Sequence, residues 1–394
     1  MREKKLKTLK EFDFKDKNVF MRVDFNVPLQ GQVIQDPYRI EKSFASIEFI
    51  LKQGGRLLLA SHLGRPKGRD LSLSLRTVAQ YLSEKKNLEV LFIEEPDSLL
   101  PKKLLKGLKS PQVILLENLR FHRGEENLDK NLAKKLANYT DIYINEAFSI
   151  SHRNHTSLSL LPELVKEKGV GFQFEKEIQM LSPLVNQDLE KPLCVILGGS
   201  KLKDKIPLME ALINQADIFL IGGLMAYTFL KAKNCFVGKT LVETSSLNLA
   251  KNFIDRLELR NKDYFLPVDF KGQWKDQIKN WNLENFPETA TAYDIGSKSI
   301  QMFQNQIRKA KSIFWNGPMG FFENEIYSLG TSSLAQFVAN HKTAYRIVGG
   351  GHSALAVRQY EGEIDHISTG GGASLSYLQE KEFIGLKKLY TLQN

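Results

Sequence analysis

Cysteine is scarce in this chain, and long apolar runs are missing from it. The 394 residues include only two cysteines, Cys194 and Cys235, which are too few for a disulfide framework and favour a reducing, cytoplasmic location. No apolar run approaches the roughly 18 residues that cross a membrane. The segment after Met1 also lacks the apolar core of a secretory signal. We therefore expect neither export nor a membrane partner.

Recognisable nucleic-acid motifs are missing as well, although the formal net charge is +10. Such a charge permits a nucleic-acid partner. The lysines are scattered over amphipathic stretches, however, and no RNP, zinc-finger or helix-turn-helix pattern occurs. We expect a basic, solvated surface that also steers anionic small molecules, and no nucleic-acid partner.

Short apolar runs alternate with amphipathic helical patterns along the whole chain. This alternation predicts an α/β fold with doubly wound, parallel, Rossmann-like sheets. The length suits two domains of roughly 150 residues or more each. A glycine hinge at 169–171, a helical pattern at about 174–189 and Pro192 separate the halves. We predict domains at 1–171 and 191–377, with a connecting helix at 172–190.

A glycine turn with two lysines opens the second half. The apolar run 193–197 is typical of a strand buried on both faces, and Gly198 and Gly199 follow it. Lys201 and Lys205 come next, spaced to share one face at the expected start of a helix. This pattern predicts a polyphosphate site. A glycine turn followed by a solvated lysine face explains it equally well, and it does not fit a Walker A loop.

In the first half, basic side chains accompany successive expected strands. Asp24 and Asn26 end the first strand, where ligands bind in open parallel sheets. The groups that we expect at the same sheet edge are Arg39, His62, Arg65, Arg120 and Arg153. A surface ion pair explains each arginine taken singly. Together they predict a site for a small, multiply charged anion.

Histidines and further glycine turns complete the pattern. His152 and His155 lack cysteine or carboxylate partners in sequence, so we expect hydrogen-bonding roles and assign no metal ligand. The triple glycines at 349–351 and 370–372 are expected at strand-to-helix turns, where consecutive N–H groups bind anions. The polar and aromatic stretch 271–286 has no clear period and is expected to be a loop. Two anion sites across a hinge favour phosphoryl transfer with closure that excludes water.

These motifs also resemble those of the phosphoglycerate kinase family, in order and spacing, over essentially the whole length. The matching stretches are RVDFNVP at 22–28, SHLGRP at 61–66, ENLRFH at 117–122, GGSK at 198–201 with DKI at 204–206, WNGP at 315–318 and STGGGASL at 368–375. The resemblance implies a two-domain glycolytic enzyme that moves a phosphoryl group between 1,3-bisphosphoglycerate and ADP. It also implies Mg²⁺ with the nucleotide, a monomer, and a segment 378–394 that returns to the N-terminal domain.

The resemblance implies a role for each matching residue. Phosphoglycerate contacts are implied for Asp24, Phe25, Asn26, Arg39, His62, Leu63, Gly64, Arg65, Arg120 and Arg153. Nucleotide contacts are implied for Gly199, Lys201, Lys205, Gly222, Gly296, Asn316, Pro318, Glu323, Gly350, Gly351, His352 and Ser353. A catalytic role at the transferring group is implied for Arg39, Lys201, Lys205, Gly371 and Gly372.

One departure from the family pattern concerns the metal. The family has an aspartate that engages the Mg²⁺-nucleotide where this chain has His352. Neutral imidazole is a poor ligand for a hard cation. Either phosphates and waters alone hold Mg²⁺, or a protonated His352 contacts a phosphate. Other departures are Leu224, Ser297 and Glu146. His352 and the high positive charge leave open a rival hypothesis, a catalytically weakened paralogue that binds phosphoglycerate or a partner protein.

Overall fold

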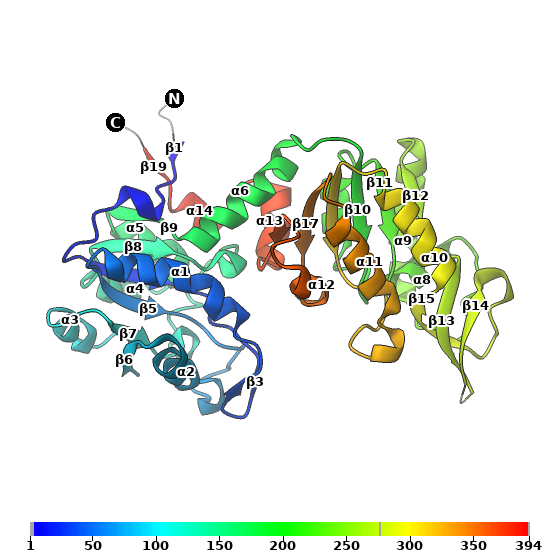
Figure 1. Cartoon of the computed structure of the whole chain (residues 1–394). Coiled ribbons are helices and arrows are strands. Elements are labelled where there is room, and N and C mark those ends of the chain that lie inside the picture. The colour runs from blue at the N-terminus through cyan, green and yellow to red at the C-terminus, as the bar shows by residue number, and fades with distance from the viewer. Residues whose placement is uncertain (1–3, 276, 393–394) are drawn as a thin grey trace. The chain divides into compact units, whose positions relative to one another are not determined.

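The computed structural model describes residues 4–275 and 277–392 (Figure 1). The chain divides into two compact units, one of Met1–Gln179 with Glu382–Asn394 and one of Met180–Lys381. The boundary lies within helix α6 (Phe172–Asn186). Each unit is built on a six-stranded parallel sheet, which confirms the predicted α/β class. None of the described helices combines the length and the apolarity that crossing a membrane requires.

The sheet of the first unit has the strand order β6-β7-β5-β2-β8-β9. Its strands are β2 (Asn18–Arg22), β5 (Arg56–Ala60), β6 (Glu89–Ile93), β7 (Gln112–Leu116), β8 (Ile142–Asn145) and β9 (Glu167–Val170). Its helices are α1 (Tyr38–Lys52), α2 (Arg76–Lys86), α3 (Leu100–Leu105), α4 (Lys130–Ala137), α5 (Leu161–Leu164) and α14 (Ile384–Lys387). Short pairs are β1 (Lys4–Lys5) with β19 (Thr391–Leu392), and β3 (Leu29–Gln30) with β4 (Val33–Ile34).

Alternation along each strand explains why helices cover both faces of this sheet. Val19 and Met21 of β2 belong to the core that α1 and α2 complete, with Ile47 among its members. Phe20 faces the other way and stacks on Tyr143 of β8. Both faces of a parallel sheet are therefore buried, and ligand-binding groups are left to the loops at the carboxyl ends of the strands.

The second unit repeats this plan with the strand order β12-β11-β10-β16-β17-β18. Its strands are β10 (Leu193–Leu197), β11 (Ile218–Ile221), β12 (Asp263–Phe265), β16 (Ser312–Asn316), β17 (Tyr345–Gly349) and β18 (His366–Ile367). Its helices are α7 (Ile206–Leu212), α8 (Met225–Ala232), α9 (Leu247–Leu259), α10 (Ser297–Ile307), α11 (Leu329–Asn340), α12 (Gly351–Val357) and α13 (Gly372–Glu380). A second, antiparallel sheet joins β13 (Asp269–Trp274), β14 (Gln277–Asn282) and β15 (Thr291–Ile295).

That second sheet corrects the prediction of a loop at 271–286. Strands β13 and β14 pair in register, with Phe270 opposite Trp281. Both aromatic rings contact Phe286 in a small core. Apart from Ile278 and Trp281, the residues of β14 are polar, and these two fall on opposite faces, so no alternation of apolar residues marked the strand.

The expected helical start at the two lysines is also wrong. Helix α7 begins at Ile206, so Lys201 lies in the preceding loop and Lys205 occupies the N-cap position. Pro207 in the first turn explains this start, because proline suits the first positions of a helix and is excluded from its interior. The spacing of the two lysines therefore reflects a turn and not a helical face.

Candidate active site

Asp24 organises an anion pocket at the carboxyl end of the first unit's sheet. Its Oδ2 atom accepts hydrogen bonds from Arg39 Nη1 and Ser149 Oγ, and its Oδ1 accepts one from the main chain of Asn26 at 3.1 Å. Burial opposes the charged carboxylate, but the charge of Arg39 and the hydrogen bonds from Ser149 and Asn26 outweigh it and lower the pKa of Asp24 to about 2. Asp24 is therefore an anion at physiological pH and fixes Arg39 beside it.

Gly64 ties three loops of this pocket together. Its N–H donates to Asn26 Oδ1 at 2.9 Å, and its carbonyl accepts from Arg120 Nη1 at 2.5 Å. Its φ of +62° strains any residue with a Cβ, which would in addition meet Leu73 at 2.7 Å. The tie brings Asn26 and Arg120 to one place, as the sequence predicted for neighbouring strand ends.

The interior of the pocket strongly lowers the pKa values of its two imidazoles, His62 and His155. Burial, helped by the charges of Arg22, Arg120 and Arg39, lowers the pKa of His62 well below its usual value. Burial and the charges of Arg22, Arg120 and Arg153 lower the pKa of His155 to about 3. Both rings are neutral at physiological pH, so they can form hydrogen bonds but add no charge to the pocket.

Sequence reasoning missed Arg22 as a member of this cluster. Its side chain is fully buried, donates from Nε to Ser157 at 3.0 Å and lies 4.0 Å from Glu125. An arginine within the otherwise apolar strand β2 was the signal that should have been used, because buried charge needs a partner. Arg65, by contrast, is exposed, and the described contacts do not join it to the cluster.

Two of the predicted contacts reach the pocket only through their main chains. The side chains of Phe25 and Leu63 are 0% and 1% exposed and belong to the core. The main-chain N–H of Phe25 is bonded to Ser61 Oγ at 2.8 Å, and the carbonyl of Leu63 to Asn118 at 2.7 Å. These residues hold the loops in shape.

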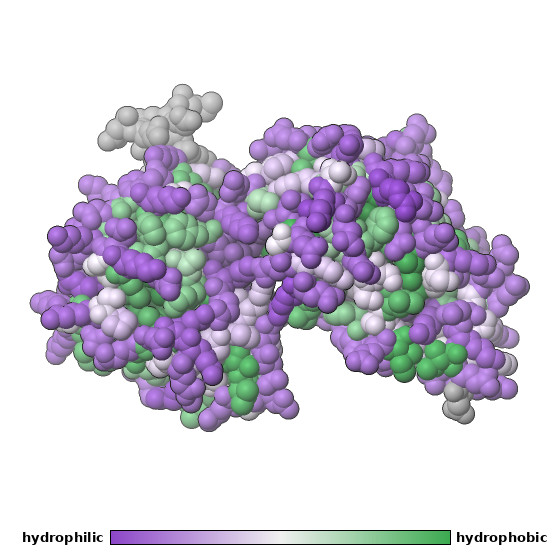
Figure 2. Space-filling model, in the orientation of Figure 1, coloured by the Kyte–Doolittle hydropathy of each residue, from purple (hydrophilic) through white to green (hydrophobic). Residues whose placement is uncertain are grey.

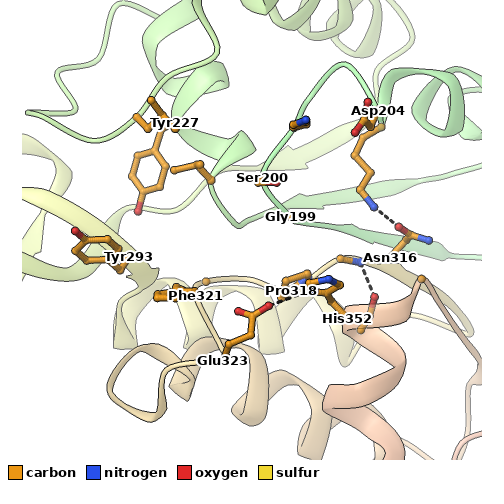
Figure 3. A pocket seen from close by; sticks show the side chains of 18 of the residues that line it. Gly199, Ser200, Asp204, Tyr227, Tyr293, Asn316, Pro318, Phe321, Glu323 and His352 are labelled. Atoms are coloured by element: carbon orange, nitrogen blue, oxygen red, sulfur yellow. Dashed lines mark hydrogen bonds and ion pairs between the residues drawn. The ribbon is translucent and has the colours of Figure 1, made fainter. Parts of the chain in front are cut away.

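The second unit contains a cavity of about 570 Å³ at the carboxyl ends of β10, β16 and β17 (Figure 3). The predicted nucleotide contacts on its wall are Gly199, Lys201, Lys205, Asn316, Pro318, Glu323, Gly350, Gly351, His352 and Ser353. Gly222 and Gly296 lie outside the wall. A Cβ on Gly222 would meet Met319 Sδ at 2.4 Å, and one on Gly296 would meet the Asp269 carboxylate at 2.3 Å. Both glycines permit close packing next to the cavity.

Main-chain contacts between two glycine turns form the floor of the cavity. The N–H of Gly199 donates to the Pro318 carbonyl at 2.9 Å, and a Cβ on Gly317 would lie 2.1 Å from the Gly198 carbonyl. Ser353 Oγ accepts from the N–H of Gly317 at 2.7 Å and donates to the carbonyl at the end of β17, also at 2.7 Å. One buried hydroxyl thus holds two loops of the wall together.

Lys205 is the half-buried cation of this cavity. Its ammonium group donates to Asn316 Oδ1. Burial lowers its pKa from 10.5 to about 8, and only Asp204 opposes the shift. Lys201 is exposed on the loop before it. The cavity therefore offers one desolvated and one solvated ammonium group to an anion.

Aromatic and aliphatic side chains form the opposite end of the cavity, and they were not predicted. Figure 3 shows Tyr227, Tyr293 and Phe321 on one side, away from Asn316 and His352. Leu224 and Leu241 also line the cavity. A flat apolar group with an anionic tail, such as a nucleoside phosphate, suits a cavity with one apolar and one cationic end.

Comparisons by family model, by sequence and by structure all give the same family. The phosphoglycerate kinase family model matches residues 9–381. A phosphoglycerate kinase of Bdellovibrio bacteriovorus is 47% identical, covering 98% of each chain, and one of Acidobacterium capsulatum is 42% identical, covering 97% of this chain and 98% of its own. The solved structure from Coxiella burnetii has a TM-score of 0.85 at 32% identity, covering 98% of this chain and 99% of its own. The structure from Pyrococcus horikoshii has a TM-score of 0.86 at 31% identity, covering 97% and 98%.

The chain belongs to the phosphoglycerate kinase family. It is accordingly a phosphotransferase of glycolysis, as the sequence motifs predicted. Within this phosphoglycerate kinase the glycine turn at 370–372 stands apart from the cavity. Gly371 has a φ of +50° and precedes α13, and both Gly371 and Gly372 are exposed. Neither lies on the cavity wall.

Mg²⁺, which the phosphoglycerate kinase family normally uses with its nucleotide, finds a poor protein ligand set in this cavity. The described residues contain no cluster of three or more histidine, cysteine or carboxylate groups that could hold a metal ion. His352 Nδ1 lies 2.8 Å from Glu323 Oε1, so the imidazole engages the carboxylate that lines the same wall. The donor set fits a metal that arrives on the nucleotide phosphates better than one held by the protein.

Proposed function

We propose that this chain catalyses reversible phosphoryl transfer between 1,3-bisphosphoglycerate and ADP, giving 3-phosphoglycerate and ATP. One observation carries the proposal. A chain that matches the family over residues 9–381 has a cluster of cationic side chains at the carboxyl end of each of its two parallel sheets. We further propose that the enzyme acts as a monomer in the cytoplasm.

The first unit is proposed to bind phosphoglycerate. Arginine presents planar, bidentate donors to carboxylate and phosphate groups, and Arg39 and Arg120 are already fixed by Asp24 and Gly64. Neutral His62 adds a hydrogen-bonding group without adding charge. Phe25, Asn26 and Leu63 would contribute chiefly by shaping the loops, and Arg65 and Arg153 would complete the cationic rim.

The second unit is proposed to bind ADP or ATP. The base would occupy the end lined by Tyr227, Tyr293 and Phe321, and the phosphates the end with Lys201 and Lys205. Aromatic side chains stack on flat rings, and ammonium groups neutralise phosphate oxygens. Glu323 is proposed to accept a hydrogen bond from the ribose, and Gly350, Gly351 and Ser353 to present main-chain groups nearby.

Mg²⁺ is proposed to enter with the nucleotide and to neutralise charge on its phosphates. The described residues form no metal cage, and His352 is engaged with Glu323. Waters and phosphate oxygens would complete the octahedral shell that Mg²⁺ demands. His352 therefore acts on Glu323 or on the nucleotide and not as a metal ligand.

The transfer step itself is proposed to be direct and in line, without a phosphoenzyme. Phosphoryl transfer requires positioning and positive charge around the equatorial oxygens more than covalent help from the protein. Arg39, Lys201 and Lys205 would supply that charge. The N–H groups of Gly371 and Gly372, exposed at the start of α13, would bind oxygens of the transferring group once both substrates bring the units together.

A coupled assay tests the proposal. The purified chain receives 3-phosphoglycerate, ATP and Mg²⁺, and glyceraldehyde-3-phosphate dehydrogenase converts the product with oxidation of NADH. Turnover on the order of 10 s⁻¹ or more is expected of an ordinary enzyme. Turnover near background at saturating substrates would contradict the proposal and favour the weakened paralogue, particularly if calorimetry still detected binding of both substrates.

A further inference from the structure

A basic segment of the first unit, residues 98–111, plays no part in either pocket. Its exposed side chains include two neighbouring leucines, Leu99 and Leu100, whose exposed fractions are 73% and 48%. The exposed cations of the segment are Lys102, Lys103, Lys106 and Lys109. Figure 2 shows hydrophilic residues over most of one face, with apolar patches between them. Among the exposed large apolar residues of the described part of the chain, Leu99 and Leu100 are the only two that are consecutive in sequence.

The segment is anchored so that these side chains face outward together. Helix α3 and its flanks bury Pro101, Leu105 and Leu108, which attach the segment to the unit. The helical hydrogen bond from Lys103 N to the Leu99 carbonyl, at 3.3 Å, shows that the helical turn already includes Leu99. Residues four apart lie on the same helix face. Figure 1 shows α3 at the outer edge of this unit, next to β6 and β7.

The positive charge of the segment is not compensated nearby. Residues 98–111 contain no aspartate or glutamate. The acidic residues just before them already have partners: Glu94 pairs with Arg69 and Arg76, Glu95 with Arg69, and Asp97 with Lys135 and His122. Among the described residues, none forms an ion pair with the four lysines.

We propose that the basic segment docks on the surface of a membrane that carries anionic lipids. Lysines beside an anionic bilayer are attracted to its headgroups, and exposed leucines enter the boundary between headgroups and acyl chains. A segment with both features suits this surface. The expectation of no membrane partner rested on the absence of a spanning segment, and peripheral docking does not need one.

Single-stranded nucleic acid is the other polyanion that four lysines attract, but the segment lacks the groups that bind it well. Such sites combine cations with aromatic rings on which bases stack, or with arginine. The basic segment contains neither aromatic residues nor arginine. Exposed leucines add nothing to contacts with phosphate, whereas they add apolar contact with a bilayer.

Vesicle co-sedimentation tests the proposal. The full-length enzyme is mixed with phosphatidylcholine vesicles, or with vesicles in which a third of the lipid is phosphatidylserine. One variant changes Lys102, Lys103, Lys106 and Lys109 to Glu, and another combines Leu99→Ser with Leu100→Ser. A matched control changes four exposed lysines outside the segment, Lys17, Lys251, Lys311 and Lys342, to Glu. Kinase activity, expected to be unchanged in the segment variants, verifies their folding.

The expected result is sedimentation of the wild type with anionic vesicles only, with partition reduced about tenfold or more in the lysine variant. Partition of the leucine variant onto anionic vesicles should be several-fold weaker than that of the wild type, and the control variant should keep most of its binding. Equal losses in the segment and control variants would overturn the proposal, because they would indicate net charge alone. Absence of binding to anionic vesicles, or tighter binding to single-stranded RNA that the leucine variant retains, would overturn it as well.

Discussion

The two pockets prepare for anions by different means. In the first unit, guanidinium groups are fixed in advance, with Arg39 held by the Asp24 carboxylate and Arg120 by the Gly64 carbonyl. In the second unit, the cations are lysines, and only Lys205 has a fixed partner, the amide of Asn316. Fixed guanidinium groups suit a small rigid acid, whereas mobile ammonium groups and glycine turns suit a flexible chain of phosphates.

The acidic residues of the two pockets also differ in how deeply they are buried and in what they hold in place. Asp24 has a pKa of about 2 and is a permanent anion that organises the cations around it. Glu323 is half-exposed and interacts with His352 at the rim of its cavity. The first pocket is therefore built around a buried charge, and the second around main-chain turns. We expect side-chain substitutions to cost more in the first pocket than in the second.

The largest effect is expected for Arg39→Ala. The substitution removes a guanidinium group proposed to touch both phosphoglycerate and the transferring group, and it leaves the buried Asp24 carboxylate without its ion pair. We expect kcat/KM to fall by about 10²- to 10³-fold or more, as when a preorganised donor is removed. Steady-state kinetics in both directions measure it. Arg76→Ala, at an exposed ion pair on α2, is the matched control and should change little. An equal loss in both variants would refute the special role of Arg39.

Lys205 should give the second pocket its pH dependence. Its pKa of about 8 means that the free enzyme loses this charge as the pH rises through 8. Bound phosphates favour the ammonium form and raise the pKa, so binding takes up a proton above about pH 8 and affinity falls with rising pH. We expect ADP affinity to drop about tenfold for each unit above that point.

Calorimetry in buffers of different ionisation enthalpy measures the proton uptake directly. Uptake should be large near pH 8.5 and close to zero near pH 6.5, where the wild-type lysine is already charged. Lys205→Arg should abolish it, because arginine stays protonated. Lys201→Arg is the control and should leave it in place. Persistent uptake in Lys205→Arg would assign the proton to another group.

For His352→Asp we expect a smaller, several-fold change in Mg²⁺-ADP affinity or in turnover. The imidazole and Glu323 form a pair on the cavity wall, and aspartate would replace it with an oxygen ligand that Mg²⁺ prefers. We expect tighter binding of Mg²⁺-ADP or faster turnover, with a lower Mg²⁺ concentration at half-maximal rate. His341→Asp, at a histidine that does not line the cavity, is the control. If neither affinity nor turnover changes, His352 does not govern metal handling.

Sequence patterns predicted the parallel sheets well because both faces of each are buried, so strands such as β10 are continuous apolar runs. Asn26 and Arg120 were found because they follow strand ends, Lys205 because a glycine turn precedes it, and Asn316 through the resemblance of WNGP at 315–318 to the family motif. The aromatic end of the nucleotide cavity was not found. Tyr227, Tyr293 and Phe321 come from three separate elements, and no spacing along the chain relates them. Arg22 was missed because its partner, Glu125, lies far along the sequence.

The smallest effects are expected when one hydroxyl group is removed from each pocket. Ser149 donates to the Asp24 oxygen that also binds Arg39, whereas Ser353 bridges two main-chain turns. Ser149→Ala should raise the KM for 3-phosphoglycerate about two- to threefold and leave the KM for ATP unchanged, because its hydrogen bond to the charged Asp24 carboxylate acts on the substrate only through Arg39. Ser353→Ala should do the reverse, with a somewhat larger loss because the buried Gly317 N–H is left without a partner. A double variant with additive effects would show that the two pockets bind independently. If each variant changed the KM values of both substrates, the two pockets would instead be coupled.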